Sequence, residues 1–505
     1  MITAFSNQRY FDYLREHLGS SFLWDYLRYD EHGDLWINSL RVRDAVSVYG
    51  TPLEIHDLTI MAKRSQFWKD LVFRVASSVG YPGSFHYYYA SKANMSLPYV
   101  VCAYRNGWMA ETSSAQDLVH IEQLVRRGFL DRSVQIICNG FKFPVVSPRS
   151  QSFPLQSAVD LSSFHSSFLP FPQRYADMIL ELFASGYAIT PIFDSGEVDY
   201  FISHVRRGRM DIGLRLKFGI VHDDNHLLRG ISRHGMSWTE LVRCAEQVVA
   251  CNHFCLTMLH VMVSAAQVVS VGEMVRSLLF GAEKFFLLKR RYPTLRFLNI
   301  GGGIPSLSTG YHYELFLREF LSGLLSLSKT YSLDPPDIVF EFGSYLAEEC
   351  GFYVHRILQR KNNSFDRDEG MLHWAIIDGG LMAGLPDMFI TRRSFQVIAG
   401  NNAYQPFGEF VLGDLSCDSD GRYPPRGSSF QRVLLPFGDD QLVVIAGVGA
   451  YQRMLGGAGG AHHCGILNAG QLYIDVVDGV LRSKYVPPQS EESFAQLLGY
   501  GDDYF

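Results

Sequence analysis

Strand-like and helix-like segments alternate through the middle of the chain, and this alternation constrains the fold more than any other feature. Parallel strands joined by helices make right-handed crossovers, and eight such units can close into a barrel. The predicted strands are 85–90, 108–112, 134–138, 188–193, 212–217, 256–263, 297–300 and 337–342. The sequence therefore predicts an α/β fold containing a (β/α)8 barrel. An open, doubly wound sheet is the alternative, and the count of eight favours the barrel.

The last part of the chain follows a different pattern. Strands and turns succeed one another after residue 374 without intervening helices, which favours a β-rich second domain. We expect residues 1–50, an amphipathic helix followed by strands, to contribute to that domain. Residues 51–373 are predicted to form the barrel and residues 374–505 the rest of the β-rich domain. Prolines and serines replace any periodic pattern at 144–173, so this stretch is predicted to be an insertion: a lid, an interface element or a partly disordered segment.

The composition is that of an ordinary globular protein and argues against several kinds of partner. The net charge is -6 and no basic block stands out, so neither nucleic acid nor a membrane is expected as a partner. The first residues lack the basic and apolar regions of a secretory signal, and a cytoplasmic location is expected. The longest apolar stretch, 255–272, contains His260 and Gln267, which suits a buried strand better than a membrane span.

The cysteines give no sign of a metal centre. The eight cysteines are scattered without a CxxC pair, so free thiols in a reducing compartment are expected. His462, His463 and Cys464 are consecutive and could be imagined as metal ligands. We expect no metal there, because adjacent side chains diverge and no second cluster completes a site.

Lys92 follows the first predicted barrel strand almost directly. The aromatic run from 85 to 89 favours a buried strand, so Lys92 is placed just past its carboxyl end. Parallel α/β folds carry their chemistry at those ends. A solvated lysine that opens a loop is the alternative, and position alone favours it.

Two other strand ends supply complementary chemistry. Gly301, Gly302 and Gly303 follow the seventh strand, where backbone amides can approach a phosphate closely, although a plain turn is the commoner role of such a run. Glu341 ends the eighth strand, where a buried carboxylate needs a cationic partner. A lysine able to form a Schiff base, a phosphate cradle and a carboxylate for a pyridinium nitrogen together indicate a pyridoxal 5'-phosphate site.

These residues belong to a series of short motifs that resembles one family in order. The series resembles the fold-type III pyridoxal-phosphate decarboxylases, which include diaminopimelate and ornithine decarboxylases and share their barrel with alanine racemase. The resemblance covers roughly residues 27–480. Its motifs here are Gly50-Thr-Pro-Leu53, Ala90-Ser-Lys-Ala-Asn94, Glu111 to Asp117, Asn139-Gly-Phe-Lys142, Asn299 to Gly303, Glu341-Phe-Gly343, Asp378-Gly-Gly380, Gly413 to Asp418 with Asp420, and Gly449-Ala-Tyr451.

The resemblance implies a role for individual residues. It implies that Lys92 binds the cofactor covalently and that Glu341 pairs with its pyridine nitrogen. It implies that Tyr451 holds the phosphate together with the three glycines at 301–303. It further implies a homodimer with shared active sites, in which Cys417 protonates the carbon left by decarboxylation and Asp418 meets the substrate side chain. From composition alone, a buried free thiol and a turn residue would be the usual roles of those last two.

The sequence also departs from the family pattern. Met262 stands where the family has the histidine that stacks on the cofactor ring, and its sulfur can contact an aromatic face without carrying charge. Phe342 and Ser344 replace the proline and arginine of the family's Glu-Pro-Gly-Arg, which removes one cationic contact near the phosphate. The arginine that grips a distal carboxylate in diaminopimelate decarboxylases is absent near Pro386, which argues against that substrate.

Together these features predict a homodimeric pyridoxal-phosphate-dependent decarboxylase. The expected substrate is an amino acid or an amino-acid conjugate, and Asp418 suggests that it carries a distal amine or another polar end. An amino-acid racemase or epimerase on the same fold is one alternative. A catalytically degenerate regulatory homologue is the other, motivated by the departures at Met262 and Ser344.

Overall fold

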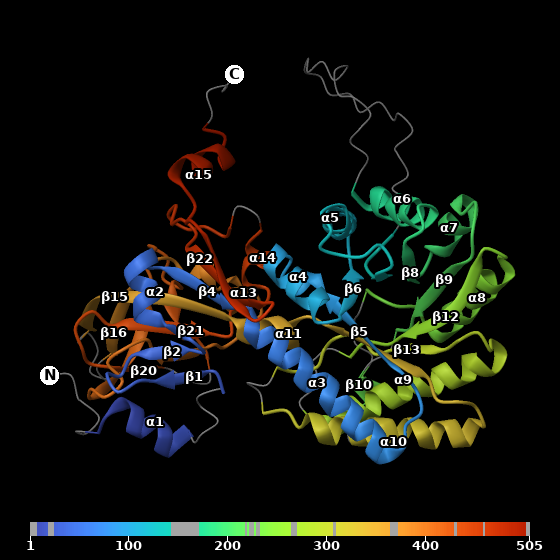
Figure 1. Ribbon diagram of the computed structural model, residues 1–505, viewed down its shortest axis with the longest axis horizontal. Helices are drawn as coiled ribbons and strands as arrows, with labels where there is room; N and C mark the ends of the chain where they lie inside the picture. Colours follow the sequence, from blue (N-terminus) through green and yellow to red (C-terminus); the bar gives the residue numbers. More distant parts are fainter. Residues whose placement is uncertain are drawn as a thin grey trace. The chain divides into compact units, whose positions relative to one another are not determined.

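The computed structural model divides the chain into two compact units. It describes residues 8–18, 25–142, 171–217, 220–221, 227–228, 233–263, 270–306, 310–363, 372–428, 432–457 and 460–500. The barrel unit comprises residues 65–343, and the strand-rich unit comprises residues 1–64 and 344–505 (Figure 1). Nearly all of the predicted insertion at 144–173 lies outside the described residues. None of the described helices has an apolar stretch long enough to cross a membrane.

The barrel unit is built on eight parallel strands that close on themselves in the order β12-β13-β14-β5-β6-β7-β8-β9. The closure lies between β14 and β5, where Glu341 pairs in register with Tyr88. This confirms the predicted barrel and excludes the open sheet. The strands are β5 (Phe85–Ala90), β6 (Met109–Thr112), β7 (Gln135–Cys138), β8 (Ala188–Phe193), β9 (Met210–Arg215), β12 (Phe254–His260), β13 (Phe297–Asn299) and β14 (Asp337–Phe342).

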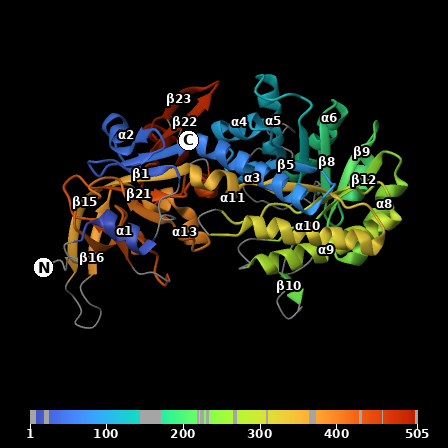
Figure 2. The ribbon, with the colours of Figure 1, turned by 60° about the horizontal axis from the view of Figure 1, so that its bottom comes forward.

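Helices surround these strands. Both views of the ribbon show the two long helices α9 and α10 lying side by side (Figures 1 and 2). Trp68 of α3 is fully buried, and its ring meets Phe340 and Phe342 of β14 edge-on. The helices are α3 (Leu58–Val79), α4 (Leu97–Arg105), α5 (Ala115–Arg126), α6 (Phe171–Ala184), α7 (Val198–His204), α8 (Trp238–Ala250), α9 (Val271–Arg291) and α10 (Tyr313–Tyr331).

An apolar layer fills the interior of the barrel. Alternate residues of a strand point to the same side, so each strand places one residue in the layer. At Gly213 of β9, the neighbouring Ile192 side chain fills the space, since a Cβ atom on Gly213 would lie 2.3 Å from the Ile192 Cδ1 atom. The members of the layer on the other strands are Tyr88, Met109, Ile137, Ile192, Met258, Phe297 and Val339.

The strand-rich unit is organised around a ten-stranded sheet. Its main path runs β19-β18-β16-β15-β4-β22-β23, with β17, β20 and β21 paired alongside. The strands are β4 (Leu53–Asp57), β15 (Gly351–Asn363), β16 (Leu372–Ile377), β17 (Gln396–Ala399), β18 (Phe407–Gly413), β19 (Arg422–Tyr423), β20 (Val433–Pro436), β21 (Leu442–Ala446), β22 (Gly470–Val477) and β23 (Val480–Val486).

Shorter elements complete the strand-rich unit. The predicted N-terminal helix is α1 (Tyr10–Leu18), which buries Tyr10 and Leu14 against Phe407 of β18. A small sheet of β1 (Leu27–Tyr29), β2 (Leu35–Ile37) and β3 (Leu40–Arg41) precedes α2 (Val42–Tyr49). The short helices are α11 (Ser344–Ala347), α12 (Leu381–Gly384), α13 (Pro386–Ile390), α14 (Gln452–Gly456) and α15 (Glu491–Leu497).

The division between the units falls elsewhere than the boundaries drawn at 50 and 373. β4 pairs antiparallel with β15 and parallel with β22, so residues just after 50 belong to the strand-rich sheet. β15 begins at Gly351 and carries the sheet well before residue 373. The reason is long-range strand pairing, which the local pattern of residues does not encode.

A buried ion pair holds the end of β7 to the loop after β8 in the barrel unit. The side chains of Lys142 and Glu197 are both fully buried, and the Lys142 Nζ atom lies 3.3 Å from Glu197 Oε2. Lys142 Nζ also donates hydrogen bonds to the carbonyl oxygens of Gly140 and Ile192, each at 2.7 Å. The Glu197 carboxylate accepts the backbone N–H groups of Lys142 and Asp194. Each buried charge is thus neutralised and hydrogen-bonded, which its burial requires.

We predict that Lys142→Met lowers the free energy of unfolding by about 3–5 kcal/mol, because it leaves the Glu197 carboxylate buried without its cation. Urea unfolding followed by tryptophan fluorescence measures the change. Lys329→Met, at an exposed position near the end of α10, is the matched control and should stay within about 0.5 kcal/mol of the parent. The double variant Lys142→Met/Glu197→Gln should recover part of the loss. Equal stability of Lys142→Met and the parent would contradict this account of the pair.

Candidate functional site

A polar layer lies directly above the apolar layer in the barrel unit. On each strand, the residue two positions after the apolar one also faces the barrel interior. These residues form a second layer around the barrel. On β5 the corresponding residue is Ala90, and Lys92 follows two residues later. The remaining members are Glu111, Asn139, Asp194, Arg215, His260, Asn299 and Glu341. The carboxyl end of the barrel thus carries three acids, two amides, an arginine and a histidine beside one lysine.

Lys92 lies in a short 3-10 turn, Ser91–Ala93, whose backbone is tied down on both sides. The Ser91 hydroxyl lies 3.3 Å from the Glu111 carbonyl oxygen and from Asp117 Oδ1. On the other side the Tyr89 hydroxyl donates to the Asn94 carbonyl. The Lys92 side chain is 42% exposed, and its Nζ atom lies 3.7 Å from Glu111 Oε1. A fixed backbone therefore presents a partly accessible amine beside a buried carboxylate.

Asp117 links the Lys92 turn to the start of α5. Its carboxylate accepts the backbone N–H groups of Ser113 and Ser114, and the Ser114 side chain caps the helix in return. Burial raises the pKa of Asp117, and its hydrogen bonds to Ser113 and Ser114 oppose that change. The motif from Glu111 to Asp117 thus contains a capping box, formed by Ser114 and Asp117, and Asp117 also positions Ser91.

Glu341 is held in place by two amide side chains. Asn299 Nδ2 donates to Glu341 Oε1 at 2.6 Å and Asn139 Nδ2 donates to Oε2 at 2.8 Å. His260 Nε2 lies 3.7 Å from the same Oε2 atom. Burial, reinforced by the nearby Glu111 charge, raises the pKa of Glu341 to about 7. The carboxyl group is therefore poised to share a proton with a basic group near neutral pH.

The glycine loop after β13 passes close to these side chains. Gly301 has a φ of +67°, and a Cβ atom there would lie 3.2 Å from both His260 Nε2 and Met262 Sδ. A Cβ atom on Gly302 would lie 2.7 Å from the Glu341 carbonyl oxygen. Gly303 has a φ of +80°. A side chain at any of these positions would be strained or obstructed, which leaves backbone close to the ring of polar groups.

Several polar atoms of the ring have hydrogen-bonding capacity to spare. Among the described residues no hydrogen-bond partner is found for Glu111 Oε2, Asn139 Oδ1 or either ring nitrogen of His260. Burial, with the charges of Arg215 and Lys92, holds the pKa of His260 well below its usual range, so its ring is neutral. Burial also lowers the pKa of Arg215, and the charges of Glu341 and Asp194 oppose that effect. Buried groups left in this state suit a polar ligand that completes their bonds.

The polar layer therefore fits an aromatic cofactor that carries a carbonyl group, a nitrogen atom in its ring and a phosphate. Lys92 offers an amine for the carbonyl, Glu341 a carboxyl group for the nitrogen, and the glycines at 301–303 an open backbone for the phosphate. Met262, predicted to stand in place of a histidine, lies beside His260 at the same glycine, so the barrel still supplies a neutral imidazole there.

The other predicted site residues belong to the strand-rich unit. Tyr451 directly precedes α14 and has a φ of +69°, a left-handed conformation that side chains rarely adopt. Cys417 and Asp418 lie in the loop after β18. Within this unit they meet His463 and Cys464, which lie between α14 and β22.

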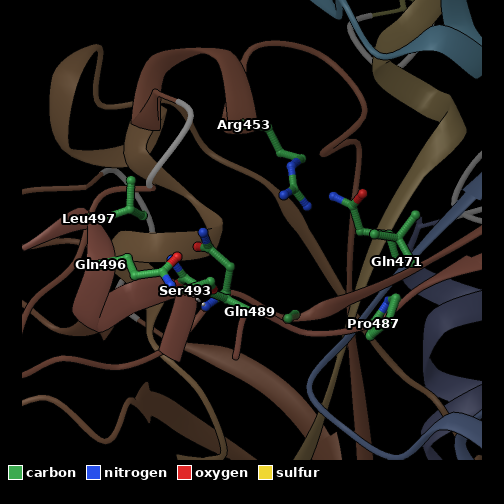
Figure 3. A pocket seen from close by; sticks show the side chains of 10 residues that line it. Arg453, Gln471, Pro487, Gln489, Ser493, Gln496 and Leu497 are labelled. Atoms are coloured by element: carbon green, nitrogen blue, oxygen red, sulfur yellow. Dashed lines mark hydrogen bonds between the residues drawn. The ribbon is translucent and has the colours of Figure 1, made fainter. Parts of the chain in front are cut away.

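A pocket of about 480 Å³ also lies within the strand-rich unit, next to β22 and α15. Four of its ten lining residues carry amide side chains. Arg453 and Gln471 lie on one side of the pocket, while Gln489 and Gln496 lie on another (Figure 3). Arg453 and Gln471 are held by the buried carboxylate of Glu54, at 3.5 and 3.2 Å. None of the predicted site residues is among the described residues that line this pocket.

Neither a family model nor a curated protein matches the sequence, but solved structures match its fold. The biosynthetic arginine decarboxylase SpeA from Campylobacter jejuni has a TM-score of 0.76 at 16% identity, covering 97% of this chain and 92% of its own. Diaminopimelate decarboxylase from M. jannaschii has a TM-score of 0.70 at 12% identity, with coverages of 93% and 97%. Lysine decarboxylase from Selenomonas ruminantium has a TM-score of 0.59 at 15% identity, with coverages of 83% and 93%.

The chain has the fold of these decarboxylases. The similarity spans both units, and it confirms the predicted combination of a barrel with a β-rich domain.

Some members of the polar layer were not singled out as site residues from the sequence. The sequence presents Glu111, Asn139 and Asn299 only as parts of motifs, and it gives no local sign that Arg215 and His260 belong with them. The signal that could have found them is their position: each is the last residue of a barrel strand or lies next to its end. Register along each strand was needed to see that they point inward.

We predict that Glu341 makes the cofactor-free protein less stable as pH rises. Its pKa is raised from 4.5 to about 7, so the folded state binds a proton that the unfolded state releases between these values. That contribution is complete below pH 4.5 and lost as pH passes 7. At pH 8, Glu341→Gln should therefore have a free energy of unfolding higher than that of the parent by on the order of 3 kcal/mol, and it should unfold at a higher temperature. This difference should shrink toward pH 5.

Thermal unfolding of cofactor-free protein between pH 5 and 8 measures this difference. Glu314→Gln on α10, whose side chain is 51% exposed, is the matched control and should follow the parent at every pH. Parallel curves for the parent and Glu341→Gln would show that Glu341 ionises normally.

Proposed function

We propose that this protein is a pyridoxal-phosphate-dependent amino-acid decarboxylase of the fold-type III family. One observation carries the proposal: the Lys92 amine stands at the mouth of a ring in which two amides fix the Glu341 carboxyl group and the glycine loop runs alongside. The fold shared with arginine, diaminopimelate and lysine decarboxylases supports it. One structure with this fold, a double mutant of SrLDC, is a complex with PLP.

When bound, pyridoxal phosphate supplies an electron sink for the pair of electrons left at Cα as the carboxylate departs. Lys92 would hold the cofactor covalently through Nζ. Glu341 would share a proton with the ring nitrogen of the cofactor, and its raised pKa favours this sharing near neutral pH. Asn139 and Asn299 orient Glu341 for that contact. Gly301–Gly303 and Tyr451 would hold the phosphate.

The strand-rich unit would supply the second half of the chemistry. The Cys417 thiol would deliver a proton to Cα after carbon dioxide leaves, and Asp418 would meet the substrate's distal end. We propose a homodimer in which these two residues act across the subunit interface, as the family resemblance implies. We also propose that the enzyme works in the cytoplasm.

Asp418 favours a substrate with a distal amine or another polar end. A carboxylate attracts a cationic amine, whereas it repels the distal carboxylate of diaminopimelate. We therefore propose an amino acid such as ornithine or lysine, or an amino-acid conjugate with an equivalent end. A panel of such compounds tests this by carbon dioxide release, and the distal-carboxylate analogue is its matched negative.

We predict that Lys92→Ala abolishes cofactor attachment. Wild-type protein mixed with pyridoxal phosphate should gain a visible absorbance band, and borohydride should convert it to a permanent adduct on the peptide that contains Lys92. Lys92→Ala should show neither the band nor the adduct and should lose decarboxylation by at least about 100-fold. Lys329→Ala, at an exposed position on α10, should behave like wild type. A wild-type protein without band or adduct would refute the cofactor assignment.

The reaction type needs a separate measurement. In deuterated water, a decarboxylase releases carbon dioxide and places deuterium at Cα of the amine product. A racemase or epimerase would place deuterium at Cα with the carboxylate retained. Cofactor attachment with deuterated, carboxylated substrate as the product would refute decarboxylation and assign the racemase reaction instead.

A further inference from the structure

Cys417 and Cys464 face one another in the strand-rich unit although 47 residues separate them. Their sulfur atoms lie 3.1 Å apart, roughly 1 Å more than a disulfide bond requires. They are the two exposed cysteines among the eight, whereas Cys102, Cys138, Cys244 and Cys350 are buried. Oxidants and reductants in solution can therefore reach this pair selectively.

Cys464 is placed so that its surroundings would stabilise a negative charge on its sulfur. The Cys417 backbone N–H group donates to the Cys464 sulfur at 3.2 Å, and His463 Nδ1 lies 3.0 Å from it. These contacts, led by the backbone N–H group, lower the pKa of Cys464, while the contact with Cys464 raises the pKa of Cys417. A thiolate is the reactive form toward peroxides and disulfides. The pair thus consists of a nucleophilic Cys464 and a resolving Cys417.

The surroundings favour a disulfide over a metal ion. His463 Nε2 lies 3.9 Å from Asp418 Oδ2, so the carboxylate faces the ring nitrogen opposite to the one near Cys464. Among the described residues the cluster offers three ligand atoms, those of Cys417, His463 and Cys464. A closed structural zinc site needs four ligands. The side chains of His463 and Cys464 do converge here, against the expectation from their adjacency in sequence.

We propose that Cys417 and Cys464 form a reversible disulfide that switches off the proton-donating thiol of this enzyme. The bond itself follows from the geometry of the pair, whereas its effect on activity rests on the proposed role of Cys417 in decarboxylation. The switch is a modification site that leaves the barrel residues untouched. Its oxidant is a hydroperoxide and its reductant is a dithiol.

The chemistry balances in two steps. The Cys464 thiolate attacks one oxygen of hydrogen peroxide, which breaks the O–O bond, forms a sulfenic acid and releases hydroxide that takes up a proton to become water. The Cys417 thiol then attacks the Cys464 sulfur, the S–S bond forms and a second water leaves. A dithiol reverses the reaction by two exchanges and is itself oxidised. In the oxidised form Cys417 has no S–H proton to give.

The bond is tested on the full-length, reduced protein treated with hydrogen peroxide and then alkylated with a maleimide. We expect a mass loss of two hydrogens before alkylation, protection of both thiols from the maleimide, a peptide linking Cys417 to Cys464, and recovery of both thiols with dithiothreitol. Cys464→Ser should form no linked peptide. The double variant Cys251→Ser/Cys255→Ser removes the two partly exposed cysteines and is the matched control, which should form the bond like wild type.

Activity is the second readout. Oxidation should lower decarboxylation by about 100-fold, as expected for loss of a general acid, and dithiothreitol should restore it. Cys464→Ser should stay active and resist peroxide. An active enzyme that forms no linked peptide would overturn the switch and leave the proposed function standing. A linked peptide in a protein without decarboxylase activity would leave the disulfide standing and sink the proposed function.

Two further results would overturn the switch. The first is one equivalent of Zn²⁺ bound to wild type and lost in Cys464→Ser, with no linked peptide, which would assign a metal site instead. The second is peroxide inactivation of Cys464→Ser to the same extent as wild type, which would place the sensitive group elsewhere.

Discussion

The two-residue repeat of the parallel strands determines which side chains face the interior at the barrel mouth. Side chains two apart on a strand point to the same side, so an apolar layer at one level dictates which residues form the next. Tyr88, Ile137 and Val339 fill the lower level. The level above is polar on seven strands and is completed by Lys92 beyond the eighth. The same strand register therefore determines both the packing of the apolar layer and the positions of the polar side chains above it.

The polar level is held together by groups that burial disfavours. Burial raises the pKa of Glu341 and lowers the pKa values of Arg215 and His260. Each change favours the neutral form of the side chain, because little water reaches it. Amide hydrogen bonds to Glu341 offset part of that cost. A ligand that supplied the remaining hydrogen bonds would bind the folded state alone and stabilise it. Functional sites often retain such uncompensated groups for this reason.

The sequence was sufficient to predict the barrel. Short apolar segments alternating with helices predict eight crossovers, and Lys92 and Glu341 stand where strands end. Arg215 and His260 were missed, because their orientation depends on register. The boundaries of the units were displaced because β4 pairs with β15 and β22, far along the chain. The approach of Cys464 to Cys417 likewise depends on how two distant loops fold, which no local pattern records.

The pairing of β4 also fixes an order of events during synthesis. β4 is complete by residue 57, yet both of its neighbours in the sheet, β15 and β22, are made only after the whole barrel unit. The barrel strands, by contrast, pair almost entirely with strands made just before or after them, apart from the closure of β14 on β5. As the chain leaves the ribosome, the barrel can therefore fold first, while β4 stays unpaired until β15 has been synthesised.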